Sequence, residues 1–197
     1  MDLETLTEQG ARFIIDTYRP DVLVNNAGIT RLRFNEDLPQ ESWDEVMAVN
    51  LRAPWLLSQA MLKIHGKAAK DITIINVASM GYKCALRCSA AYNASKAGLV
   101  ALTRQMAREA ADRYPGFVFY AVSPNSVGDT GMLEECRRAL VDIRGMSEEQ
   151  SHKYLVASPL GRLERPDEVA STVRYLVMER PVYLTGTNIE HTGAGPT

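Results

Sequence analysis

The sequence predicts an α/β protein with a doubly wound parallel sheet of about four strands and helices on both faces. Three observations favour this class. Apolar runs of strand length alternate with longer segments of helical pattern, in the order α-β-α-β-α-β-α-β. The strand runs are largely apolar, which is typical of strands covered on both faces. No internal repeat, low-complexity tract or linker divides the chain, so we expect a single domain over residues 1–197.

Four apolar runs are the expected strands. Residues 21–24 open the first, residues 72–77 form the second and residues 117–122 the third. Residues 188–190 form a weaker fourth run near the end of the chain. Strands of this length, separated by helical segments, predict parallel pairing through helical crossovers.

Helical patterns fill the intervals between the strands. The first covers residues 4–18, and the third covers residues 90–113, just before the Pro115-Gly116 pair. The second is expected to begin at Ser42, which forms a capping-box pattern with Glu45, and to run to about His65.

A fourth helix is expected to begin at Pro166, because proline is favoured in the first turn and Asp167 and Glu168 complement the helix dipole. Before it, residues 125–165 form a long mixed segment that interrupts the alternation. Segments of this kind are often substrate loops or lids, and we expect that role here.

Composition excludes several classes of function. A formal charge of −2 gives no electrostatic reason to expect nucleic acid or a membrane surface as partner. No apolar run approaches the ~20 residues that span a bilayer, and the acidic start of the chain does not have the features of a secretory signal. Three cysteines without CxxC spacing and three scattered histidines indicate neither a disulfide framework nor a metal site. We therefore expect a cytoplasmic protein.

Tyr92 and Lys96 are the centre of the functional prediction. Residues four apart on a helix lie on one face, one turn from each other. An ammonium about 5 Å from the phenol, at an effective dielectric of ~20, would lower the tyrosine pKa by roughly two units and make it a usable general acid or base. The same spacing also occurs in surface pairs without function, so the surrounding residues decide.

Two strand ends carry polar groups where ligands bind in open α/β sheets. Ser79 closes the second strand, and its hydroxyl could bond a substrate carbonyl or alcohol beside Tyr92. Asn25-Asn26-Ala27-Gly28 occupies the corresponding position after the first strand.

Asn50 is a further candidate, inside the helix expected over residues 42–65. Pro54 follows four residues later and has no N–H, so the Asn50 carbonyl loses its helical partner. The free carbonyl could hold a water near Lys96 and complete a proton path to solvent. A plain proline kink would produce the same pattern.

These features, in this order and spacing, resemble the motifs of the short-chain dehydrogenase/reductase family, in its 3-oxoacyl-reductase-like type. The likeness continues through residues 158–162, 166–170 and 183–186, and covers roughly residues 3–195. It implies a Rossmann-like fold and hydride transfer between NAD or NADP and a small-molecule carbonyl or alcohol.

The resemblance also implies roles for individual residues. Tyr92 would be the acid/base, and Lys96 would lower its pKa and bind the nicotinamide ribose. Ser79 would orient the substrate oxygen, and Asn50 would hold the relay water. The cofactor-binding residues implied are Asn25, Ala27, Gly28, Tyr92, Lys96, Pro124, Asn125 and Thr130.

The sequence departs from the family at its start. The family begins with a strand, a Gly-rich turn and further elements that have no counterpart here. These make up a little under two βαβ-type units, or roughly 50–60 residues if a unit has about 30. We therefore expect a truncated domain. The missing elements would make hydrogen bonds to the pyrophosphate and ribose of the dinucleotide. Losing three or four such bonds of ~1.5 kcal/mol each would raise a micromolar dissociation constant to millimolar. The strand at residues 21–25 would become an exposed edge.

A second departure lies after the third strand, where the Pro-Gly turn of the family reads Pro124-Asn125. Asparagine adopts positive φ more readily than most residues, which would preserve such a turn. The resemblance assigns a contact with the nicotinamide to a threonine such as Thr130. One extra residue between Pro124 and Thr130 changes the spacing on which that assignment depends.

Two other interpretations stay open. The first is a non-catalytic subunit that binds a partner through the exposed edge or through the helices over residues 42–65 and 90–113, which would give a stable complex without cofactor binding. The second is a wrongly assigned start codon, in which case the true protein would be longer and would contain the usual elements of the family. The four retained residues favour an enzyme, while the missing turn argues against efficient turnover by this chain alone. The family resemblance implies a homodimer or homotetramer, and leaves the substrate and the choice between NAD and NADP open.

Overall fold

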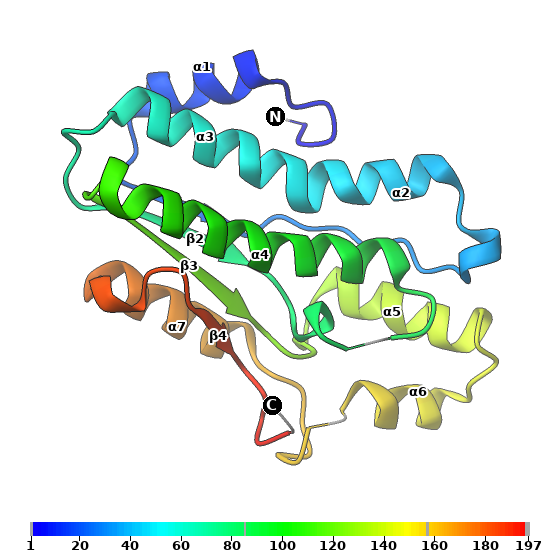
Figure 1. Ribbon diagram of the computed structural model, residues 1–197. Coiled ribbons are helices and arrows are strands. Elements are labelled where there is room, and N and C mark those ends of the chain that lie inside the picture. The colour runs from blue at the N-terminus through cyan, green and yellow to red at the C-terminus, as the bar shows by residue number, and fades with distance from the viewer. Residues whose placement is uncertain (1, 85, 157, 196–197) are drawn as a thin grey trace.

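The computed structural model describes residues 2–84, 86–156 and 158–195, which form a parallel sheet in the order β1-β2-β3-β4 (Figure 1). The strands are β1 (Val22–Asn25), β2 (Ile72–Val77), β3 (Phe117–Ser123) and β4 (Asn188–Glu190). Each strand begins and ends within one residue of its predicted range. The predicted α/β class with about four parallel strands is confirmed.

One face of the sheet is covered by α1 (Glu8–Tyr18), α3 (Ala53–His65) and α4 (Ala90–Arg113). Ile15 of α1 and Met61 of α3 are buried in the same cluster as Ile74 and Phe119 of the sheet. In Figure 1, α1 lies on the outer side of α3, and α4 runs across β2 and β3. This face holds the larger part of the core.

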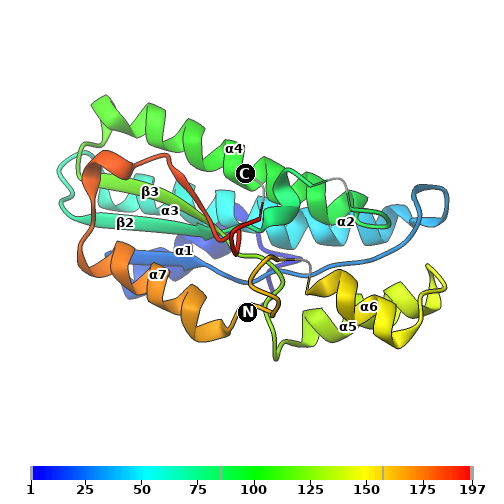
Figure 2. The ribbon, with the colours of Figure 1, turned by 90° about the horizontal axis from the view of Figure 1, so that it is seen from below.

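The opposite face is covered by α7 (Pro166–Met178). Leu176 is fully buried against Ile75, Tyr120 and Val122, whose side chains point away from the α4 face. Figures 1 and 2 both place α7 on the side of the sheet opposite α4. Helices on both faces are therefore confirmed.

The connection from β3 to β4 has the opposite hand to the two before it. β4 adds to the sheet in the same direction as β2 and β3, yet its crossover helix lies on the other face. Parallel crossovers are right-handed in nearly all cases, so this one is unusual. The chain between β3 and α7 passes around the carboxyl ends of the strands, where Figure 2 shows α5 and α6.

The segment over residues 125–165 contains α5 (Gly131–Asp142) and α6 (Glu148–Leu155); residue 157 lies outside the described residues. Thr130 caps α5 by accepting a hydrogen bond from the Leu133 N–H at 3.2 Å. Ser147 and Gln150 form a capping box at the start of α6. The segment is thus helical for about half its length and lies beside the strand ends.

Two predicted helix starts are corrected. The first helix begins at Glu8 and not at residue 4, because the Thr7 side chain accepts the Gly10 N–H at 3.1 Å and caps the helix there. The predicted capping box at Ser42 is wrong. The helix α2 (Gln40–Met47) begins directly after Pro39, so Ser42 already lies in its first turn.

The helix predicted over residues 42–65 is not continuous. Between α2 and α3 lies a π-helical turn, η2 (Ala48–Arg52), where the Ala53 N–H bonds to the Ala48 carbonyl five residues back. Pro54 follows at the start of α3 and cannot supply an α-helical bond. Wide turns of this kind occur frequently at functional sites, and this one contains Asn50. The remaining predicted ends, at residues 90, 113 and 166, agree with the structure.

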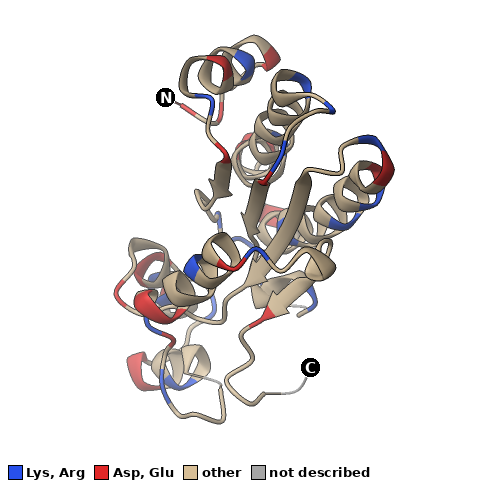
Figure 3. Cartoon of the chain, turned by 90° about the vertical axis from the view of Figure 1, so that its left-hand side faces the viewer, with Lys and Arg blue, Asp and Glu red and all other residues tan. Residues whose placement is uncertain are grey.

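The surface features fit the composition. Figure 3 shows Lys and Arg interspersed with Asp and Glu over the helices. Within the described residues, no helix is long and apolar enough to cross a bilayer.

β1 pairs on one side only, with β2, and Val24 is 39% exposed, so this strand is an edge of the described sheet. Short turns of 3-10 helix complete the chain: η1 (Asn35–Asp37), η3 (Met80–Tyr82) and η4 (Val182–Leu184).

Candidate active site

The carboxyl ends of β1 and β2 bring four of the predicted residues to one place. Ser79 follows β2, Tyr92 and Lys96 lie on the first turns of α4, and Asn50 lies on η2. Two glycines show how closely these groups approach. A Cβ on Gly28, after β1, would lie 3.3 Å from Lys96 Nζ and 3.4 Å from Asn50 Oδ1.

A second glycine marks the other half of the cluster. A Cβ on Gly81 would lie 3.4 Å from both Ser79 Oγ and Tyr92 Cε1, and 2.9 Å from Asn93 Oδ1. The Gly81 N–H donates to Ser79 Oγ at 3.1 Å and fixes that hydroxyl. Ser79 and Tyr92 are therefore neighbours, as their spacing around a strand end and helix predicts.

Lys96 is buried to an unusual degree for a lysine, with 3% of its surface exposed. Its Nζ donates to the Val77 carbonyl at 2.8 Å and lies 5.8 Å from the centroid of the Tyr92 ring. Burial disfavours the ammonium and lowers the pKa of Lys96 to about 8. Of its three N–H donors, the described residues satisfy one.

The predicted effect of Lys96 on Tyr92 is not found. Burial raises the pKa of Tyr92 above its usual value, the neighbouring Ser79 hydroxyl lowers it in part, and the nearby Cys136 opposes ionisation. The Lys96 ammonium lies 5.8 Å from the centroid of the Tyr92 ring and donates to the Val77 carbonyl, and burial disfavours its charged form. Burial therefore favours the protonated form of the Tyr92 phenol.

Asn50 is fully buried, and its side chain joins three elements. Its Nδ2 donates to the Ile29 carbonyl at 2.9 Å, and its Oδ1 accepts the Ile29 N–H at 2.9 Å. Nδ2 also lies 3.1 Å from Ser95 Oγ, which in turn donates to the Tyr92 carbonyl at 2.7 Å. The side chain thereby fixes the loop after β1 against α4. The prediction from the sequence concerned only the Asn50 carbonyl and did not include this role.

Asn25 is part of a buried amide chain and does not face the cluster through its side chain. Its Nδ2 donates to Asn76 Oδ1 at 2.8 Å, and Asn76 Nδ2 donates to Thr103 Oγ1 at 2.9 Å. This chain ties β1 and β2 to α4 below the site. Asn76 and Thr103 were not predicted; the signal for Asn76 is an amide inside an otherwise apolar strand. Ala27 is exposed beside Gly28.

The remaining predicted cofactor residues follow β3. The Pro124 carbonyl accepts the Met80 N–H at 2.8 Å, which joins this turn to the residue after Ser79. Asn125 is not among the residues with positive φ, so it does not adopt the left-handed conformation that the sequence suggested, whereas Asp129 in the same turn does, with φ 54°. The Thr130 hydroxyl donates to the Val127 carbonyl at 3.2 Å and caps α5, so its hydrogen bonds are local.

Across the described ranges, no group of three or more His, Cys, Asp or Glu side chains could hold a metal ion. The three cysteines are free, with Cys84 exposed and the other two partly buried. The side chains that meet in the cluster offer a phenol, a hydroxyl and a buried ammonium for chemistry.

Comparisons with known proteins identify the family of the chain. The family profile described as enoyl-(acyl carrier protein) reductase matches residues 4–193. The 3-oxoacyl-(acyl-carrier-protein) reductase FabG of Vibrio cholerae is 35% identical over 173 residues, which are 88% of this chain and 65% of that protein. The human (3R)-3-hydroxyacyl-CoA dehydrogenase is 33% identical over 174 residues, 88% of this chain and 62% of that protein. The chain thus spans a little under two thirds of the length of these two relatives.

A solved structure gives the same result for the fold. A proposed NAD(P)-dependent gluconate 5-dehydrogenase from Beutenbergia cavernae, with NADP bound at low occupancy, superimposes with a TM-score of 0.82 and is 30% identical. The match covers 98% of this chain and 74% of that one. The chain therefore belongs to the short-chain dehydrogenase/reductase family, in its 3-oxoacyl-reductase-like type.

Proposed function

We propose that the protein is an NAD(P)-dependent oxidoreductase that transfers a hydride between a nicotinamide cofactor and a carbonyl or alcohol substrate. The observation that carries this proposal is the convergence of Ser79, Tyr92, Lys96 and Asn50 around Gly28 and Gly81. The cofactor, when bound, supplies or accepts the hydride. The protein supplies geometry, hydrogen bonds and a proton.

The proton belongs to Tyr92. A phenol whose pKa is raised by burial is protonated at neutral pH and suits donation to a carbonyl oxygen, the direction of reduction. The Ser79 hydroxyl, beside the Tyr92 ring, would hold the substrate oxygen within reach of that proton. Asn50 acts through the Tyr92 backbone and the loop after β1, and its carbonyl remains the candidate for a relay water.

The residues present fit the nicotinamide end of the cofactor. Lys96 is nearly fully buried and has two N–H donors beyond its bond to Val77, which suits hydroxyl groups of a ribose. Gly28 keeps the space beside Lys96 Nζ open, because any side chain there would meet Nζ. Ala27 and the Pro124–Thr130 turn border the same strand ends and complete the proposed binding residues.

Relatives guide the choice of substrate to test. Two of them carry names for the reduction of 3-oxoacyl groups or the reverse oxidation of 3-hydroxyacyl groups. We propose 3-oxoacyl thioesters as the first substrate class, with residues such as Met80, Tyr82 and Leu86 and the segment over residues 126–156 lining the pocket.

We further propose a homodimer or homotetramer in the cytoplasm. Three free thiols are compatible with a reducing compartment. A groove of about 610 Å³ lies between η2–α3 and α4, bordered by Leu51, Trp55, Gly98 and Leu102. The groove is the proposed contact between subunits, and the edge strand β1 is a second place where another chain could pair.

Calorimetric titration of the purified chain with NADH and NADPH tests the proposal, together with reduction of acetoacetyl-CoA. We expect binding that Lys96→Ala weakens, and turnover that Tyr92→Phe lowers by about 10² to 10⁴ while cofactor binding and the thermal unfolding profile stay unchanged. Absence of binding up to several millimolar would contradict the proposal and would favour a non-catalytic subunit.

A further inference from the structure

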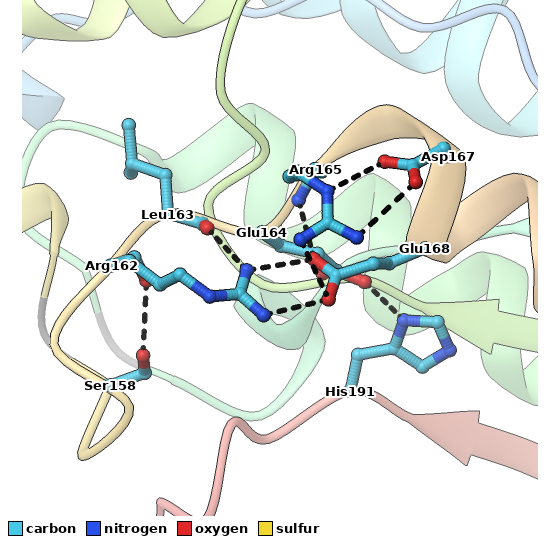
Figure 4. Close-up of polar contacts among 8 residues, drawn as sticks. All are labelled: Ser158, Arg162, Leu163, Glu164, Arg165, Asp167, Glu168 and His191. Atoms are coloured by element: carbon cyan, nitrogen blue, oxygen red, sulfur yellow. Dashed lines mark hydrogen bonds and ion pairs between the residues drawn. The ribbon is translucent and has the colours of Figure 1, made fainter.

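A polar contact outside the four-residue cluster fixes the turn after β3. Glu164, between α6 and α7, accepts the Asn125 N–H at 2.9 Å through Oε2. Its other oxygen, Oε1, contacts Nδ1 of His191, the residue after β4. Both side chains are largely buried, with 11% of the glutamate and 17% of the histidine exposed. Figure 4 shows Glu164 and His191 pointing toward each other from separate segments of the chain.

The backbone of Glu164 is attached to the same turn. Its N–H donates to the Ser126 carbonyl at 2.9 Å, and its carbonyl accepts the Gly128 N–H at 2.8 Å, which makes an isolated parallel bridge with Val127. One residue therefore holds the turn on both sides of Val127 through backbone bonds and holds the Asn125 N–H through its side chain.

His191 brings the end of the sheet to the same point. Its N–H donates to the Ser123 carbonyl at 3.0 Å and extends the β3–β4 ladder by one bond. Its ring then meets Glu164, so the carboxylate joins the last residues of two strands to the segment before α7. Because these groups are largely buried, the contact is shielded from solvent.

The segment that carries Glu164 is held from its other side by a separate ion cluster. Arg162 pairs with Glu168 at 2.8 and 2.7 Å, and the Arg165 N–H donates to Glu168 at 2.9 Å (Figure 4). The Arg162 guanidinium holds the pKa of Glu168 at about 2. These bonds of Glu168 do not involve the turn after β3, so they offer a control within the same segment.

We propose that Glu164, supported by His191, is a positioning residue for the Pro124–Thr130 turn and thereby for nicotinamide cofactor binding. This inference rests on the proposed function, in which the turn contributes to the cofactor site. Removal of the carboxylate leaves the Asn125 N–H and the His191 ring without their partner. Asn125 and His191 both border a cavity of about 270 Å³, so the turn would face open space and could move into it.

Four variants separate positioning from general stability. Glu164→Ala removes the carboxylate, Glu164→Gln keeps an acceptor for the Asn125 N–H, and His191→Phe keeps an aromatic ring without Nδ1. Glu168→Ala removes the ion pair with Arg162 and the hydrogen bond to the Arg165 N–H, and leaves the Glu164 carboxylate in place. Each is compared with the unmodified chain in amide hydrogen exchange at Asn125 in the free protein, in thermal unfolding, and in binding and KM for NADH and NADPH with acetoacetyl-CoA.

We expect Glu164→Ala to speed exchange at Asn125 and to raise the cofactor KM, each by about tenfold, the effect of one charge-assisted hydrogen bond, with kcat changed less. Glu164→Gln should restore both within about threefold of the unmodified chain, and His191→Phe should fall between the two. Glu168→Ala should lower the unfolding temperature without either effect.

Two outcomes would overturn the assignment. Unchanged exchange and cofactor KM in Glu164→Ala would show that the turn keeps its position without the carboxylate. Equal changes in exchange and cofactor KM in Glu164→Ala and Glu168→Ala would show that the effect comes from a general loss of stability and not from the position of the turn. If the unmodified chain binds neither cofactor, the proposed function itself is wrong and this inference fails with it, a result distinct from failure of the Glu164 role alone.

Discussion

Among single residues, Lys96 carries the largest conflict between stability and the proposed function. Its ammonium is almost completely removed from water and has one hydrogen-bond partner among the described residues. A pKa of about 8 in place of the ordinary 10.5 corresponds to a destabilisation of the charged form by about 3 kcal/mol. A buried charge of this kind is retained where function requires it.

We therefore predict that Lys96→Met increases the free energy of unfolding at pH 7. Relief of about 3 kcal/mol exceeds the roughly 1 kcal/mol lost with the bond to Val77, which leaves a gain of about 2 kcal/mol. Below pH 8 the lysine is protonated in both folded and unfolded states. Between about 8 and 10.5 the folded protein releases the proton first, so the wild-type protein gains stability as pH rises.

Urea unfolding at several pH values checks this prediction. The gain in stability of Lys96→Met over wild type should have its full value at pH 7 and should vanish by about pH 10, as the folded protein loses the proton. Lys153→Met, at an exposed lysine of α6, should show no such trend. A destabilised Lys96→Met protein at pH 7 would contradict the account of Lys96 as a buried charge under strain.

The sequence predicted which residues meet but not how they orient. The four-residue spacing of Tyr92 and Lys96, and the position of Ser79 at a strand end, depend on local periodicity, and the structure places these groups together. The bond from Lys96 to Val77 depends on where a carbonyl of another element lies, which no local pattern encodes. The rise in the pKa of Tyr92 follows from burial and was missed for the same reason.

At the level of elements, strand positions could be predicted and helix starts less well. β2 and β3 are buried on both faces, so their limits follow from composition alone. The helix α2 begins directly after Pro39, and Asn50 in the π-turn forms hydrogen bonds with Ile29 and Ser95 of other segments. Pro39 and Pro54 are visible in the sequence, but the bonds of Asn50 join separate segments, which the sequence pattern of a single helix does not contain.

Alanine substitutions at two glycines test the packing of elements, because one should lower the stability of the protein and the other should raise it. A Cβ on Gly116, just before β3, would lie 1.9 Å from the Ala69 carbonyl oxygen, so the backbone of the loop before β2 would have to move. At Gly131, in the first turn of α5, no atom of the described residues beyond its chain neighbours and its own helix backbone lies within 4 Å of the position that a Cβ would take. We predict that Gly116→Ala destabilises the protein by about 3 kcal/mol or more, as other forced backbone clashes do.

Gly131→Ala should instead stabilise the protein by about 0.5 to 1 kcal/mol, because alanine restricts the unfolded chain and favours the helix. Thermal and urea unfolding of the two variants measures both effects. Similar stability of the two alanine variants would mean that the loop over residues 66–71 adapts freely and does not set the position of β3.

The whole molecule places its proposed catalytic cluster and its proposed subunit contact on the same helix, α4. This helix carries Tyr92 and Lys96 near its start, and Gly98 and Leu102 follow within two turns of Lys96. Gly98 is in close contact with Leu51, since a Cβ there would lie 2.9 Å from Leu51 Cδ2. A change of packing in the outer groove would reach the site through this contact, so assembly and activity are expected to be coupled.

We predict that the protein is a dimer or tetramer in solution and that Trp55→Glu dissociates it. Trp55 is 41% exposed in the groove beside Leu51 and Leu102, and a carboxylate there would have to lose its water to keep the contact. Tyr18→Glu, at an exposed aromatic at the end of α1, is the matched control. Light scattering after size-exclusion chromatography measures the mass of each form. A wild-type monomer, or a Trp55→Glu protein with the wild-type mass, would remove the groove as the subunit contact and with it the reason to expect coupling between assembly and the site.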